Sequence, residues 1–89
     1  MNSNTVWTLK VRDSVYKTLV KFPKSDCVRL TRIIEELPLD PYRGDIEKMK
    51  GEDSSWRRRV GAYRIFYEVY QEKRLVHIFR VERRTSSTY

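Results

Sequence analysis

The segment from Trp56 to Val69 constrains the fold more strongly than any other part of this 89-residue chain. Its residues alternate in character on both sides of Gly61-Ala62, and many are of the β-branched and aromatic types that strands favour. Successive side chains of a strand point to opposite faces, so the apolar residues of the second half share one face. These residues are Tyr63, Ile65, Tyr67 and Val69. We therefore predict a β-hairpin whose apolar face belongs to the hydrophobic core.

The other face of this hairpin is predicted to carry a cluster of arginines. By the same alternation, Arg57, Arg59 and Arg64 point away from the apolar face. Guanidinium groups repel one another, and each can bind a phosphate through two hydrogen bonds. Three more basic residues join the cluster if the last strand lies beside it: Arg80, Arg83 and Arg84. The pattern favours a site for a phosphodiester backbone over an ordinary solvated sheet face.

The charge of the whole chain agrees with a polyanionic partner. It has 19 lysines and arginines against 12 acidic residues, which gives a formal net charge of +7. A basic domain of this size is typical of proteins that bind nucleic acid, an anionic membrane surface or an acidic protein. Apolar runs are no longer than three residues, so the sequence predicts no transmembrane helix and no signal peptide. This favours a cytoplasmic protein.

Apolar residues at helical spacing indicate two helices near the start of the chain. The first has Asp13 as its expected N-cap and is ended by Pro23, because the residue before a proline avoids the helical region. The second begins at about Ser25 and is stopped by Pro38. The connection between them is short, so the two helices are expected to form a hairpin.

The rest of the chain predicts a single α+β domain over residues 1–89. Alternating, β-prone residues predict four strands, and residues 39–55 are expected to form a loop. The strands are expected at residues 5–11, 56–60, 63–70 and 74–81. We expect an N-terminal strand, the helical hairpin and then a three-stranded antiparallel meander, with both helices packed on one sheet face.

Single copies of cysteine and histidine limit the chemistry of the chain. Cys27 has no partner for an intramolecular disulfide and cannot build a cysteine-based zinc site. By alternation His77 is expected to share a face with Phe79 and Val81, which favours a histidine in the core or at its edge. One histidine excludes a two-histidine ribonuclease mechanism, and the dispersed acidic residues favour no metal site. We therefore predict neither a metal ion nor a cofactor.

Several short motifs, taken together and in this order, resemble the RelE/ParE toxin superfamily. They are Asp40-Pro41, then Lys48-Met49-Lys50-Gly51, then the run from Trp56 to Val69, and finally Val81-Glu82-Arg83-Arg84 with the terminal Tyr89. Each motif is weak by itself. The similarity extends over almost the whole chain and includes the helical hairpin, so the set is specific.

This resemblance implies the toxin of a type II toxin–antitoxin pair. RelE-like members are ribonucleases that enter the ribosomal A site and cut the mRNA there, which inhibits translation. They use no metal: the mRNA 2′-hydroxyl attacks the adjacent phosphate and leaves a cyclic phosphate and a 5′-hydroxyl. The implied partners are a RelB-like antitoxin, mRNA and the ribosome with its 16S rRNA. Operator DNA is expected to be contacted only through the antitoxin complex.

The resemblance also implies roles for individual residues. Arg59 and Arg64 match phosphate-binding and transition-state residues, and Arg84, or its neighbour Arg83, matches the basic residue that assists the leaving oxygen. Tyr89 matches the terminal tyrosine that orients a base, and Glu47 matches the catalytic glutamate of the YoeB-like branch. Further basic residues are predicted to bind RNA phosphates: Lys48, Lys50, Arg57, Arg80 and Arg83.

The identity of the general acid and base stays open at the level of sequence. Some RelE-like proteins have lysines at the positions of Arg57 and Arg59, whereas an arginine does not readily lose its proton. Glu47 is either a catalytic base or an exposed loop acid. Two alternatives to the nuclease share the fold: a ParE-like inhibitor of DNA gyrase, and an inactive homologue that only binds its antitoxin. The arginine cluster and Tyr89 favour the nuclease.

Overall fold

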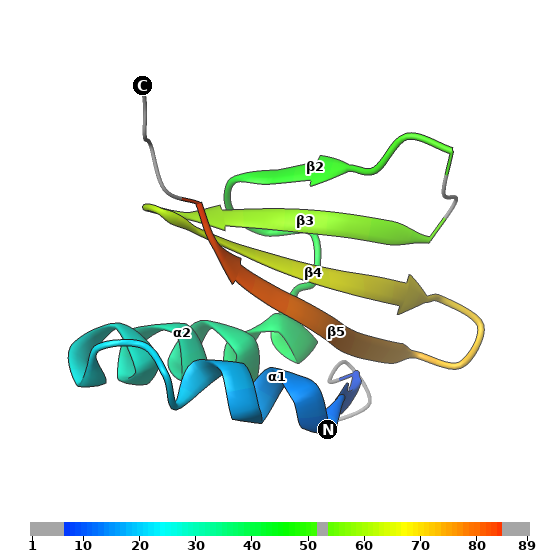
Figure 1. Cartoon of the computed structure of the whole chain (residues 1–89). Helices are drawn as coiled ribbons and strands as arrows, with labels where there is room; N and C mark the ends of the chain where they lie inside the picture. Colours follow the sequence, from blue (N-terminus) through cyan, green and yellow to red (C-terminus); the bar gives the residue numbers. More distant parts are fainter. Residues whose placement is uncertain (1–6, 52–53, 85–89) are drawn as a thin grey trace.

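Two helices pack on one face of a five-stranded sheet in the computed structural model, which describes residues 7–51 and 54–84 (Figure 1). The order of the strands across the sheet is β1-β5-β4-β3-β2. Strand β1 pairs with β5 in parallel, and the other neighbours pair antiparallel. The elements along the chain are β1 (Thr8–Val11), α1 (Asp13–Leu19), α2 (Lys24–Glu36), a 3-10 turn η2 (Leu37–Leu39), β2 (Ile46–Lys48), β3 (Ser55–Val60), β4 (Tyr63–Tyr70) and β5 (Leu75–Arg83).

The core forms between the helices and the sheet face that they cover. Helix α1 contributes Val15 and Leu19, and helix α2 contributes Leu30 and Ile34, all of them buried. The predicted apolar face of β4 is confirmed as part of this core, and two of its residues, Ile65 and Tyr67, have no exposed surface. The predicted α+β class and the placement of both helices on one face are therefore confirmed. Within the described part of the chain, no helix has the length and apolar character needed to cross a membrane.

The first helix begins differently from the prediction. Its N-cap is Arg12, whose backbone is extended and whose side chain makes no capping hydrogen bond. Asp13 is already the first helical residue, so the prediction of an Asp13 cap is wrong. A carboxylate in the first turn still interacts favourably with the partial positive charge at the start of a helix.

Part of the predicted loop is a strand. The predicted 39–55 loop contains β2, which pairs antiparallel with β3 and places Glu47 opposite Arg57. The strand is only three residues long and lies between Gly44 and Gly51, both of which have positive φ angles. Glycines of this kind indicate turns, so a sequence-based prediction assigns the whole segment to a loop and misses the short edge strand between them.

A β-bulge in β5 changes which residues face the core. Phe66 pairs with Arg80, but the next residue, Tyr67, pairs with Ile78, so Phe79 is an extra residue on β5. His77 therefore lies opposite Glu68, and its Nδ1 is 3.0 Å from a Glu68 carboxylate oxygen. The prediction that His77 shares a face with Val81 is wrong, because the bulge shifts the alternation between them.

The loop before β2 is held by residues of the central strands. The buried Tyr67 hydroxyl donates a 2.6 Å hydrogen bond to the carbonyl oxygen of Pro41. Arg58 donates to the carbonyl of Arg43 at 3.3 Å and packs beneath Gly44, where any side chain would overlap its guanidinium group. These contacts fix the path of the chain into β2 and thereby position the acidic residues described next.

Candidate anion-binding site

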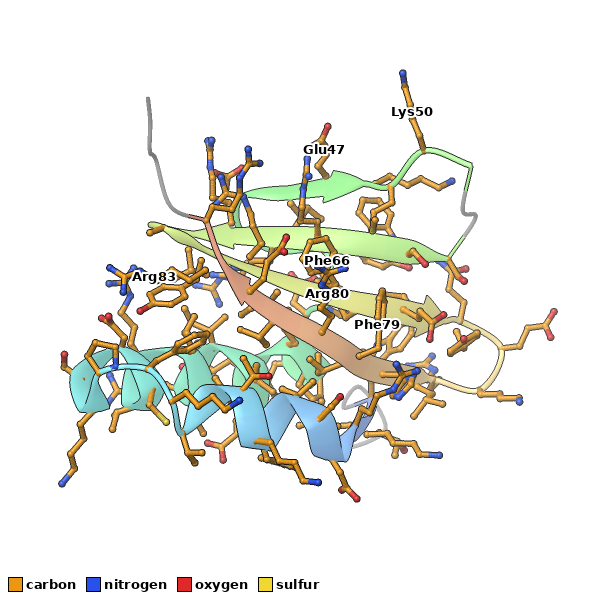
Figure 2. All side chains as sticks on the ribbon, in the orientation of Figure 1. Glu47, Lys50, Phe66, Phe79, Arg80 and Arg83 are labelled. Atoms are coloured by element: carbon orange, nitrogen blue, oxygen red, sulfur yellow. The ribbon has the colours of Figure 1, made fainter. Side chains whose placement is uncertain are left out.

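A pocket of about 210 Å³ on the sheet face opposite the helices brings together the predicted arginines. We call this face the open face; it carries Arg57, Arg59 and Arg64. Figure 2 shows Glu47 pointing from β2 away from the helices, toward the same side. The pocket is lined by four arginines and two acidic residues: Arg57, Arg59, Arg64, Arg84, Asp45 and Glu47.

Arg59 and Arg64 occupy paired positions on β3 and β4. The Arg59 Nε donates a 2.7 Å hydrogen bond to the carboxylate of Asp45, and its main-chain N–H donates to the Asp45 carbonyl at 2.9 Å. Both side chains of this ion pair are more than half exposed, so its contribution to stability is small. Its main effect is to orient the Arg59 guanidinium group toward the pocket.

Arg64 lies among the other arginines of the pocket and, within residues 7–51 and 54–84, has no direct ion pair. Its guanidinium group donates to the carbonyl oxygens of Gly61 and Tyr63, at 3.2 and 3.0 Å, and among the described residues it has no carboxylate partner. Partial burial and the neighbouring charges of Arg84, Arg59 and Arg57 lower the pKa of Arg64 below its ordinary value. A bound anion relieves this repulsion, which makes Arg64 a natural contact for a phosphate.

Glu47 and Arg84 complete the pocket from opposite sides. Glu47 forms an ion pair with Arg57, the residue that it faces across the β2–β3 ladder. Arg84 follows the end of β5, and its main-chain N–H donates a 2.6 Å hydrogen bond to Ala62 in the hairpin turn. This bond keeps Arg84 beside Arg64, although the two residues are far apart in sequence.

The balance of charges defines what the pocket can bind. Four guanidinium groups and two carboxylates leave a net charge of about +2. Guanidinium groups bind phosphate oxygens in a planar, two-pronged geometry and keep their charge at any physiological pH. Among the described residues, no three or more histidine, cysteine and acidic side chains converge to form a possible metal site. The arrangement is suited to a phosphate group with additional charge in its transition state.

The remaining predicted site residues lie outside the pocket. Arg80 is on the open face but stacks over the Phe66 ring at 5.4 Å and pairs with Glu82 at 3.0 Å. Arg83 projects to the helix side, where its guanidinium group lies 5.8 Å from the centre of the Tyr63 ring (Figure 2). The prediction that Arg83 joins Arg84 in the arginine cluster is therefore wrong, because successive residues of an extended chain point to opposite faces of the sheet.

Lys48 and Lys50 lie next to the pocket rather than in it. They line a separate hollow of about 240 Å³ that also includes Glu47, Met49 and Arg57. Tyr89, the predicted base-orienting residue, lies outside the described residues.

Asp45 is the one pocket residue that the sequence analysis missed. It is exposed and stands immediately before β2, so the prediction of a loop gave no reason to single it out. The sequence feature that could have identified Asp45 is the alternation Asp45-Ile46-Glu47, in which one apolar residue separates two acidic residues. In a strand, this pattern places both carboxylates on the same face.

Comparison with known proteins identifies the family. The family model described as "ParE toxin of type II toxin-antitoxin system, parDE" matches residues 8–87. The RelE1 protein of Methanocaldococcus jannaschii is 30% identical over 81 residues, which cover 88% of this chain and 90% of that protein.

Solved structures agree with this assignment. The RelB-RelE antitoxin–toxin complex from Methanococcus jannaschii matches with 31% identity and a TM-score of 0.68, over 83% of this chain and 88% of the solved chain. The archaeal RelE-RelB complex from Pyrococcus horikoshii shares the fold with a TM-score of 0.78 at 24% identity, over 92% and 99% of the two chains. From its family match, its curated relative and its fold, this chain belongs to the RelE/ParE superfamily of type II toxin–antitoxin toxins, with RelE-like relatives.

Proposed function

We propose that this toxin is an endoribonuclease that cleaves mRNA in the ribosomal A site and thereby inhibits translation. The observation that carries the proposal is the convergence of Arg57, Arg59, Arg64 and Arg84 on one pocket of the open face. A protein that only binds an antitoxin has no need for like charges at such close quarters, because they repel one another. A phosphate held for in-line attack needs this arrangement.

The proposed reaction is a transfer of the phosphate within the RNA strand. The 2′-hydroxyl attacks the adjacent phosphorus, the bond to the 5′-oxygen breaks, and the products are a 2′,3′-cyclic phosphate and a 5′-hydroxyl. Arg59 and Arg64 stabilise the negative charge that accumulates on the phosphate oxygens. The scheme uses no metal ion and no cofactor.

Proton transfer is assigned to groups other than these arginines. Glu47 is the proposed general base, because its carboxylate lines the same pocket and can accept the proton of the 2′-hydroxyl. In the structure this carboxylate pairs with Arg57. A bound phosphate competes for Arg57 and so makes the carboxylate available. Arg84 is proposed to stabilise the leaving 5′-oxygen, which takes up a proton from water.

The proposed partners follow from the family and the charge. Two of the similar structures are complexes of RelE with RelB, and we propose a cognate RelB-like antitoxin for this chain. An acidic antitoxin segment complements the net charge of +7. On the ribosome, the same basic surface is proposed to contact 16S rRNA as well as mRNA. Operator DNA is contacted through the antitoxin complex, and all of these encounters take place in the cytoplasm.

A second candidate function is inhibition of DNA gyrase. The observation in its favour is that the matching family model carries the name of the ParE toxin. A ParE-like toxin acts by binding a protein and does not need the arginine pocket for chemistry. The two functions therefore differ in what happens when a pocket arginine is removed.

Primer extension on a translated reporter mRNA distinguishes the two functions. The nuclease proposal predicts cuts within the A-site codon that need translation and that disappear in an Arg64→Ala variant. Gyrase supercoiling activity, measured with the same protein, should be unaffected. Inhibited supercoiling without A-site cuts would assign the protein to the ParE-like function.

A further inference from the structure

A second and larger pocket lies away from the arginine pocket. It has a volume of about 530 Å³ and lies between the loop that carries Tyr42 and the turn that joins β4 to β5. Its size is in the range typical of small-molecule or nucleotide sites. We call it the aromatic pocket; it is lined by Tyr42, Lys48, Trp56, Val69, Tyr70, Gln71, Glu72 and Lys73.

The aromatic rings of this pocket are held in fixed orientations. Tyr42 lies edge-on to Trp56 at 5.4 Å and to Trp7 at 6.4 Å, measured between ring centres. Gln71 donates a 2.7 Å hydrogen bond to the Tyr42 hydroxyl. Tyr42 nevertheless keeps 39% of its surface exposed. An exposed ring that is already fixed in place can stack on a ligand with little loss of conformational entropy.

The aromatic pocket is connected to the arginine pocket by the hollow along β2. Lys48 lines both the aromatic pocket and this hollow, and Glu47 and Arg57 line both the hollow and the arginine pocket. Lys50, also in the hollow, projects outward from the edge of the sheet beyond β2 (Figure 2). The three depressions therefore form one path around the β2 edge.

We propose that the aromatic pocket binds a base of the same single-stranded RNA whose phosphate lies in the arginine pocket, an inference that rests on the proposed function. Trp56 and Arg59 are three residues apart on β3 and point to opposite faces of the sheet, Trp56 with Tyr67 on the helix side and Arg59 with Arg64 on the open face. An RNA strand held at Arg59 therefore reaches the aromatic pocket by passing around the short β2 edge, along the hollow that Lys48 and Glu47 line. The site adds binding energy and base preference beside the reacting phosphate.

The sequence of chemical groups along the path favours RNA over a protein segment. Basic side chains line each part of the path: Lys73 at the aromatic pocket, Lys48 and Lys50 in the middle and the arginines at the far end. RNA carries both phosphates and bases, which matches a path that joins several basic groups to one aromatic platform; Glu72 and Glu47 also line this path. Stacking of a base on an aromatic side chain contributes about 1–3 kcal/mol.

Binding of a labelled RNA that cannot be cleaved tests this proposal. A short oligonucleotide with 2′-O-methyl groups lacks the attacking hydroxyl, so fluorescence anisotropy reports binding alone. Tyr42→Ala should weaken binding by about 5-fold to 100-fold, and Tyr42→Phe, which keeps the ring, should bind within about 3-fold of the original protein. Both variants should keep the circular dichroism spectrum of the original, and the melting temperature should fall more in Tyr42→Ala, which loses the ring contacts to Trp7 and Trp56.

A lysine pair supplies a matched charge control. Lys73→Ala and Lys21→Ala each remove one exposed positive charge, but Lys21 lies between α1 and α2 on the helix side. Lys73→Ala should reduce the dependence of binding on salt concentration by about one phosphate contact, and Lys21→Ala should not.

Replacing single bases of the RNA by abasic sites locates the stacked base. At one position, the abasic site should weaken binding of the RNA to the original protein but should not weaken its binding to Tyr42→Ala. The proposal is overturned if Tyr42→Ala binds RNA normally, or if it weakens antitoxin binding alone. These binding assays do not depend on cleavage. If primer extension finds no A-site cuts, the proposed function fails, but the binding results for the aromatic pocket can still be interpreted.

Discussion

Arg59 and Arg64 face each other across the β3–β4 hairpin, so two guanidinium groups project side by side from the open face. Like charges at directly opposite positions of a sheet destabilise it, by amounts on the order of 0.2–1 kcal/mol. Asp45 pairs directly with Arg59 and lies farther from Arg64, so it offsets this repulsion in part. The fold therefore tolerates an unfavourable pair at the position where an anion is expected to bind.

Replacing Arg64 should separate activity from stability. Arg64→Ala removes a proposed donor to the transition state, so A-site cleavage should fall by about 100-fold or more. The free energy of unfolding, measured with urea, should change by less than about 1 kcal/mol, because the lost repulsion offsets the lost hydrogen bonds to the Gly61 and Tyr63 carbonyls. Full toxicity of the Arg64→Ala, Arg84→Ala double variant would contradict the assignment of the site.

Glu47→Gln tests the proposed general base. Gln keeps the size of the side chain but cannot accept the 2′-hydroxyl proton, so single-turnover cleavage should fall by about 100-fold or more. Binding of the 2′-O-methyl RNA should not weaken, since Arg57 is then available to a phosphate. Glu35→Gln, on the exposed surface of α2, is the control and should cleave normally. A near-normal rate for Glu47→Gln would remove Glu47 from this role.

Gly44 and Gly51 form a matched pair for testing the loop around β2. Both have positive φ angles, but a Cβ on Gly44 would lie 2.6 Å from the Arg58 guanidinium carbon, whereas one on Gly51 meets no atom within 4 Å. Gly51→Ala should cost about 1 kcal/mol of unfolding free energy, and Gly44→Ala should cost about 1 kcal/mol more, because the Arg58 guanidinium group must move away from the Arg43 carbonyl. Equal losses in urea titrations would show that Arg58 does not confine the loop.

Tyr67 should make the protein less stable at high pH. Burial raises the pKa of Tyr67 from 10.0 to about 12. The folded state holds this proton more tightly than the unfolded state, so the resulting stability is complete below pH 10 and is lost as the pH rises toward 12. The unfolding free energy should therefore fall between those values, and by less in Tyr67→Phe. An equally steep fall in the variant would assign the effect to other tyrosines.

The same Tyr67→Phe variant should also be less stable than the original protein at neutral pH. It removes the hydrogen bond to the Pro41 carbonyl, which lies in the loop before β2. About 1–2 kcal/mol of unfolding free energy should be lost. This value, measured at pH 7, is the baseline against which the high-pH titration is compared.

Local patterns account for the parts of the fold that the sequence predicts well. The apolar stripes of the two helices and the apolar face of β4 each repeat at the period of their own element. The pairing of Arg59 with Arg64 also follows from local information, because a two-residue turn at Gly61-Ala62 fixes the register of the hairpin. These features need no knowledge of distant contacts.

The features that were missed depend on contacts between distant residues. Strand β2 is too short to show a pattern and exists because it pairs with β3. The bulge at Phe79 is visible only in the pairing of β5 with β4, and without it His77 is assigned to the wrong face. Asp45 joins the site only because β2 carries it to Arg59. The position of Arg83, in contrast, follows from simple alternation with Arg84.

Residues for the core and residues for the anion pocket alternate along β3 and β4, and this has a consequence for how the protein can change over generations. In β4, Arg64 stands between the buried Tyr63 and Ile65. Under the proposed function, a single codon change at Arg64 is expected to inactivate the pocket and leave an intact fold, so that toxicity can be lost by one substitution. Inserting or deleting one codon in either strand exchanges the two faces and removes the core and the pocket together.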